Sequence, residues 1–131
     1  MNKALSLAVA ATLSCASLNS EAQTMIGKTT DVAAIANGDR MNAETLWAMG
    51  RIGGAAASPD GNTIVYQVGY YSVKQNKSHQ MLYTISSDGK KQCALTTTAA
   101  SETDATWIDG GKRIAFLTGG QLWSMNADGT D

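Results

Sequence analysis

The sequence lacks several features that would place it in a class at once. Its formal net charge is −1 and its isoelectric point is about 5.7, so it has no basic excess of the kind that binds nucleic acid. Its longest apolar run covers residues 4–13, which is too short for a permanent membrane-spanning helix. With 44% hydrophobic residues it is not disordered by composition. One proline beside 13 glycines indicates a protein with many tight turns.

Residues for catalysis or metal binding are equally scarce. The only histidine, His79, has no G-x-S-x-G motif with which to form a hydrolase triad, and we expect it to be a solvated loop residue. The glycines of residues 50–54 lack the preceding strand and following lysine of a phosphate-binding loop. The Asp-Gly turns at residues 86–89 and 126–129 have one acid each, whereas a calcium loop needs several. We therefore predict no catalytic, cofactor-binding or metal-binding residue, and no cofactor.

The first 22 residues have the composition of a signal peptide. Lys3 supplies a basic start, residues 4–13 are apolar, and Ser20 and Ala22 are the small residues that signal peptidase requires. We predict cleavage between Ala22 and Gln23. The protein is then exported and periplasmic.

The expected roles of the two cysteines, Cys15 and Cys93, depend on whether this cleavage occurs. Cys15 could instead be a lipidation site, although Leu13 is one position too close to it for the usual motif. If Cys15 leaves with the signal peptide, Cys93 is the only cysteine of the mature segment and cannot form an internal disulfide. Residues 91–95 alternate as in a strand, so we expect Cys93 to be a small, half-buried side chain.

One unit occurs twice in the chain. Residues 57–66 (ASPDGNTIVY) return 50 residues later as residues 107–116 (WIDGGKRIAF). Residues 82–89 (LYTISSDG) return 40 residues later as residues 122–129 (LWSMNADG). The difference of ten residues is assigned to one connection, residues 69–79, which shrinks to Gly119 and Gly120 in the second copy. Four short apolar runs per repeat, separated by turns, are typical of a blade of a β-propeller.

A linker and a short helix are predicted before the repeats, in residues 23–53. Asn42 can cap a helix that Gly50 ends. Such a helix is too short to be stable alone. Leu46, Trp47 and Met49 are therefore expected to press onto the propeller or a neighbouring domain, with Trp47 as the best candidate for the latter.

Residues 54–131 are predicted to be the first two blades of an incomplete propeller, an all-β fold. Apolar phases place Trp107 and Trp123 between blades rather than against a ligand. The fourth strand of the second blade is expected to begin near Thr130, one residue before the sequence stops, and two blades cannot close a ring. We therefore expect the chain to be the front end of a larger protein. The predicted strands are residues 54–58, 63–68, 81–85 and 92–96 in the first blade, and 104–108, 113–117 and 121–125 in the second.

Two stretches carry a resemblance to a known family. Residues 42–52 (NAETLWAMGRI) followed by residues 57–66 resemble the start of secreted bacterial prolyl oligopeptidase-family serine peptidases, and the dipeptidyl-peptidase V and acylaminoacyl-peptidase branches look closest. Residues 111–116 and 122–130 are similar to the second blade of that family. The resemblance covers residues 41–131. One departure is the stretch Ile108-Asp109-Gly110-Gly111, where the family often repeats Ser-Pro-Asp-Gly.

The resemblance implies a propeller that caps an α/β-hydrolase domain and restricts access to short peptides. The Ser-Asp-His triad of the family lies in the C-terminal half, so none of its positions falls in this chain. The implied partners are that hydrolase domain and peptide substrates. The chain is then an access-controlling segment of an exported serine exopeptidase. A rival interpretation is a TolB-like periplasmic propeller that binds other proteins without catalysis, and a third is a gene remnant without function.

Overall fold

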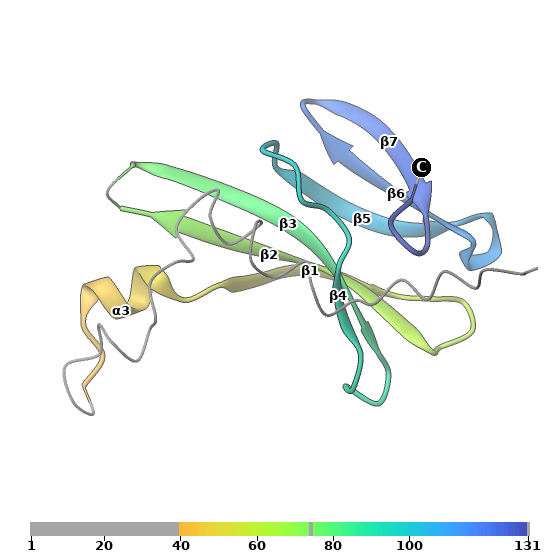
Figure 1. Ribbon diagram of the computed structural model, residues 1–131, viewed down its shortest axis with the longest axis horizontal. Coiled ribbons are helices and arrows are strands. Elements are labelled where there is room, and N and C mark those ends of the chain that lie inside the picture. The colour runs from red at the N-terminus through yellow and green to blue at the C-terminus, as the bar shows by residue number, and fades with distance from the viewer. Residues whose placement is uncertain (1–39, 74, 131) are drawn as a thin grey trace, which may run out of the picture.

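The computed structural model describes residues 40–73 and 75–130, and this part consists almost wholly of antiparallel strands (Figure 1). The predicted signal peptide, its cleavage site and most of the predicted linker lie outside the described residues. Within them, no helix is long and apolar enough to cross a bilayer. The elements are α3 (Ala43–Ala48), β1 (Arg51–Ala57), β2 (Thr63–Ser72), β3 (Lys77–Ser86), β4 (Gln92–Ala94), β5 (Glu102–Ile108), the 3₁₀ turn η1 (Asp109–Gly111), β6 (Arg113–Thr118) and β7 (Gln121–Asn126).

The strands form two separate sheets, which confirms the all-β class. The first sheet has the order β1-β2-β3-β4 and the second β5-β6-β7, and every pairing is antiparallel. Consecutive strands are neighbours throughout, as expected for a chain that folds as a series of hairpins. In the described residues these sheets do not close into a ring, so the propeller itself stays a prediction.

The β2–β3 hairpin is longer than its sequence suggests. The two strands pair without interruption from Thr63↔Ser86 to Ser72↔Lys77. The expected long connection at residues 69–79 is therefore wrong, because most of it extends the two strands. The ten residues that separate the two repeats lengthen a hairpin, which the second sheet closes at Gly119 and Gly120. Both of these glycines have positive φ, 58° and 77°, as a tight hairpin turn requires.

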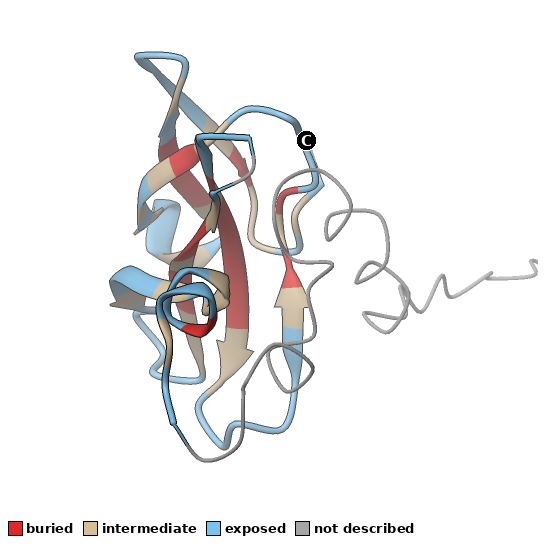
Figure 2. Cartoon of the chain, turned by 90° about the vertical axis from the view of Figure 1, so that its left-hand side faces the viewer, coloured by how far each residue is buried: buried red, intermediate tan, exposed pale blue. Residues whose placement is uncertain are grey.

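One hydrophobic cluster joins the two sheets. Val65 and Leu82, both with no exposed surface, meet Ile114, Phe116 and Met125 of the second sheet. Figure 2 shows that the buried residues, in red, lie mostly along the long strands. The predicted packing role of Trp107 is confirmed. Its ring packs against this cluster, and its Nε1–H donates to the carbonyl of Ala56 on β1 at 2.9 Å. Trp123, by contrast, is 52% exposed.

The predicted helix is confirmed with a different buried face. The Asn42 side chain accepts from the Thr45 N–H at 2.7 Å, the N-cap bond expected from sequence. The helix nevertheless ends at Ala48, and its buried residue is Thr45. Leu46 and Trp47 are 43% and 41% exposed. Six residues form less than two turns, so contact with β2 rather than helical periodicity determines which face is covered.

Candidate functional site

His79 is not the solvated loop residue that its neighbours suggested. It lies within β3 opposite Tyr70 and is only 2% exposed. Because side chains alternate along a strand, His79 shares a face with Met81 and Tyr83. The polar residues before His79 indicated a loop, but Lys77 and Ser78 are already part of β3. Among the described residues, no group of three His, Cys, Asp or Glu side chains is placed to hold a metal.

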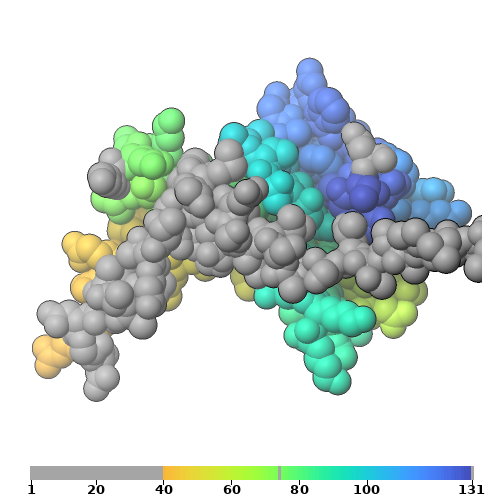
Figure 3. Space-filling model, in the orientation of Figure 1, coloured from red at the N-terminus to blue at the C-terminus, as the bar shows by residue number. Residues whose placement is uncertain are grey.

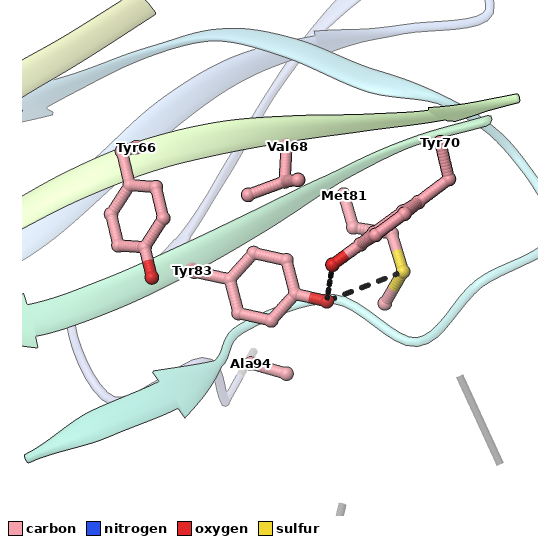
Figure 4. Packing of buried hydrophobic residues seen from close by; sticks show 6 residues of the cluster. All are labelled: Tyr66, Val68, Tyr70, Met81, Tyr83 and Ala94. Carbon is pink, nitrogen blue, oxygen red and sulfur yellow. Dashed lines mark hydrogen bonds between the residues drawn. The ribbon is translucent and has the colours of Figure 1, made fainter. Parts of the chain in front are cut away.

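A cluster of tyrosines fills this face of the first sheet (Figure 4). The hydroxyl groups of Tyr70 and Tyr83 are 3.2 Å apart, and the Tyr83 hydroxyl also contacts the sulfur of Met81 at 3.8 Å. The ring of Tyr66 stacks on that of Tyr83 with centroids 5.7 Å apart. Burial, followed by the hydrogen bond with Tyr70, raises the pKa of Tyr83, and burial also raises the pKa of Tyr66. Both phenols therefore remain neutral, which suits packing rather than acid–base chemistry.

Cys93 is half-buried on β4, as expected, and pairs with Thr84 across the sheet. It takes part in a disulfide bond. The expectation of no internal disulfide applies to the segment without residues 1–22, so it stays a prediction. That expectation depended on the removal of the N-terminal residues.

Three turns share one hydrogen-bond pattern. In the turns headed by Ser58, Ser86 and Asn126, an aspartate two residues later accepts the backbone N–H two residues beyond itself, at 3.0–3.1 Å. The intervening glycines have φ of 72°, 75° and 87°, a region open chiefly to glycine. These bonds lower the pKa of all three aspartates, for which the first cause is the side-chain hydrogen bond to Ser58, Ser86 or Thr130. The turn interpretation of the Asp-Gly pairs is thus confirmed.

A buried carboxylate lies where the chain crosses from the first sheet to the second. Glu102 is 2% exposed and accepts from the hydroxyl groups of Thr96, at 3.0 Å, and Thr98. The Thr96 oxygen in turn accepts the backbone N–H of Leu82 at 3.0 Å. Beyond the end of β4, the Thr96 hydroxyl thus accepts a backbone N–H of β3 that would otherwise bond to a neighbouring strand. A hollow of about 490 Å³ opens beside this network, and the buried Thr118 hydroxyl that lines it has no partner.

An aromatic and cationic cluster joins α3 to the β2–β3 hairpin. The guanidinium of Arg51 lies 4.7 Å from the centre of the Trp47 ring and 4.5 Å from that of Tyr71. The two rings meet edge to face with centroids 5.5 Å apart. Beside them is a hollow of about 420 Å³, lined by Trp47, Tyr71, Ser72, Val73, Asn76, Lys77 and Ser78.

Sequence reasoning missed both of these groups. Neither has a motif with fixed spacing, because each gathers residues from separate elements. The repeat alignment carried one usable signal for the buried Glu102 network: Glu102 occupies the place of the apolar Ile52, and a run of three threonines precedes it. For the aromatic and cationic cluster, the signal was Trp47, which was expected to contact another domain.

The outer face of the second sheet is apolar and exposed. Leu117 and Leu122 pair across β6 and β7 and are 39% and 73% exposed. Strand β7 pairs only with β6 in the described residues, so its other edge is open. Figure 3 shows this sheet, in blue, on the other side of the molecule from α3.

The described segment is thus a pair of stacked antiparallel sheets with open apolar surfaces and without an assembled catalytic group. Its sequence is 42% identical over 95 residues to Dipeptidyl-peptidase 5 of Porphyromonas endodontalis, which covers 70% of this chain. It is 37% identical over 81 residues to Dipeptidyl-peptidase 5 of Porphyromonas gingivalis, which covers 62% of this chain. The aligned parts span only 14% and 12% of those two proteins. No protein-family model matches the chain. The chain is therefore related to dipeptidyl-peptidases.

Proposed function

We propose that residues 51–130 form two neighbouring blades of a β-propeller that controls access to the catalytic domain of an exported serine exopeptidase. The catalytic domain lies outside these residues and is the first partner of the segment. Short peptides are the substrates of the whole protein. Export rests on the signal-peptide composition of residues 1–22.

The observation that carries this proposal is the equivalence of the two sheets. Phe116 occupies the place of Tyr66 one repeat later, and the face of the second sheet that carries Phe116 packs on the first sheet. This contact covers Val65 and Leu82, which lie on the face of the first sheet opposite to Tyr66. Leu122 is the equivalent of Leu82 and is exposed. If the same packing repeats once more, a further sheet would cover Leu122, as blades follow one another around a propeller.

Local irregularities recur as well. In both sheets the pairing of the first two strands shifts by one residue, between Ile52 and Ala55 in one and between Thr103 and Thr106 in the other. The two bulges lie within one residue of each other in the repeat alignment, and each bends the first strand of its sheet. Two sheets with a shared bulge, shared turns and one packing rule support a repeated blade rather than two unrelated hairpins.

The function follows from the relatives and from the geometry of a ring of blades. The proteins with which this segment aligns are named Dipeptidyl-peptidase 5. A propeller above a catalytic domain excludes folded proteins and admits short peptides. Cleavage would proceed through an acyl-enzyme on a serine outside residues 1–131.

The test uses the full-length protein and a fluorophosphonate probe that labels activated serines. The proposal expects one labelled serine outside residues 1–131. It also expects release of a fluorophore from dipeptide substrates with a free N-terminus, and comparison with N-acylated substrates distinguishes the two suggested branches. A full-length protein that is neither labelled nor active on either substrate would favour a binding propeller instead.

A further inference from the structure

The extra length of the β2–β3 hairpin does not serve the packing of the two sheets. The second sheet packs on the first with strands of six residues in its own hairpin, β6 and β7, against ten in β2 and β3. The additional residues, at the tip between Tyr70 and His79, lie at the same end of the molecule as α3 and far from the second sheet (Figure 1). This end therefore has another role than joining the two sheets.

The surface that the tip forms with α3 is apolar and cationic. We call it the α3 platform and define it as Trp47, Arg51, Tyr71, Val73 and Lys77. Trp47 is 41% and Val73 70% exposed, and both line the hollow of about 420 Å³ together with Lys77. A hollow of this size can take one or two side chains of a partner.

Arg51 supplies the charge of the platform. Its guanidinium lies against both the Trp47 and the Tyr71 ring, which meet edge to face, and this double contact fixes its direction. In the described part of the chain no carboxylate lies within salt-bridge distance of it, since the one ion pair there joins Lys90 and Asp88. An arginine that is half-buried, oriented and unmatched by an acid fits an acidic group on another surface.

We propose that the α3 platform docks a later domain of the same polypeptide, which inserts an acidic side chain and apolar neighbours beside Arg51. This inference rests on the proposed function. The choice of occupant follows from the length of the relatives, since the aligned segment is only 14% or 12% of them and most of such a protein lies elsewhere in the chain. The positive platform requires that the docked surface be acidic.

The first test is a carbodiimide crosslink in the full-length protein, because this reagent joins an amine directly to a carboxylate that touches it. A mixture of ¹⁴N- and ¹⁵N-labelled protein separates links within one chain from links between two. The proposal expects Lys77 to be joined to an Asp or Glu outside residues 1–131 of the same chain. Linked peptide pairs that carry one label of each kind would show a second copy as the occupant and overturn the proposal.

The second test is hydrogen exchange of the full-length protein with the variant Arg51→Gln. Residues 70–78 and the crosslinked segment should both exchange about tenfold faster, as expected when a charged contact is lost. Arg113→Gln is the matched control, because Arg113 donates to Ser124 and Asn126 within its own sheet. It should accelerate exchange only in β6 and β7. Val73→Thr, which keeps the shape and removes the apolar contact, should reproduce the effect of Arg51→Gln without disturbing the edge-to-face pair of Trp47 and Tyr71.

Unprotected amides at residues 70–78 of the unmodified full-length protein would overturn the docking. The outcome is separable from that of the proposed function. A protein that releases dipeptides but has a freely exchanging platform refutes only the docking, whereas a protected platform in a protein without a reactive serine refutes only the peptidase.

Discussion

The crossover between the two sheets gives the sharpest prediction, the effect of Thr96→Val. The Thr96 hydroxyl accepts the backbone N–H of Leu82 and donates to the carboxylate of Glu102, each at 3.0 Å. Valine has the same shape but offers neither bond. The variant leaves a buried N–H and a buried carboxylate oxygen each without that partner.

The magnitude follows from these two losses. An unpaired buried polar group costs roughly 1–3 kcal/mol, so the two together should lower the free energy of local opening by about 3 kcal/mol. At about 1.4 kcal/mol per factor of ten, the amide of Leu82 should exchange roughly a hundredfold faster. The assay is native-state hydrogen exchange of the full-length protein, read residue by residue in β3.

The control is Thr97→Val at the neighbouring position. Thr97 is exposed, and no side-chain hydrogen bond from it is described. Replacing the hydroxyl of Thr97 by a methyl group should leave the hydrogen-exchange rates of β3 unchanged. If Thr96→Val and Thr97→Val accelerate exchange at Leu82 equally, side-chain hydroxyls do not substitute for a strand beyond β4, and the description of the crossover is wrong.

Three further predictions follow from local structure. Asn42→Ala removes the N-cap and should weaken α3 by about 1 kcal/mol, seen as faster exchange of the Thr45 amide. Gly120→Ala places a side chain at φ 77° and should lower the midpoint of thermal unfolding, by a cost of about 1 kcal/mol, although no atom would clash. The lowered pKa of Asp60 means that its carboxylate stabilises the fold above the unfolded pKa near 3.8, and this contribution is lost as pH falls through the lower folded value. Between pH 5 and 2 (roughly), Asp60→Asn should therefore show a shallower loss of thermal stability than the unmodified protein.

Much of the fold could be predicted because its signals are local. The glycines of the turns, the β-branched run at residues 63–68 and the cap at Asn42 each act on their immediate neighbours. The repeat then gave the order of the strands. Each of these predictions concerned residues that determine their own conformation.

The residues whose burial or secondary structure was predicted wrongly are those whose environment is determined by distant parts of the chain. Residues 77–80 (KSHQ) have no apolar alternation, and pairing with β2 alone makes them a strand and buries His79. Glu102 is acceptable in the interior only because Thr96 and Thr98 meet it there. The exposure of Leu46 and the burial of Thr45 depend likewise on how α3 meets β2. Non-local contacts of this kind leave no mark in a single sequence.

The most direct test of the account is the chemical accessibility of position 122 in the full-length protein. Leu122→Cys is treated with a maleimide and compared with Lys90→Cys, an exposed turn position of the first sheet. If the two sheets are consecutive blades, a third covers Leu122 and the cysteine there should react at least tenfold more slowly than at position 90, in line with its burial. Equal rates at the two positions would mean that no further sheet packs on the second one, and the propeller would be contradicted.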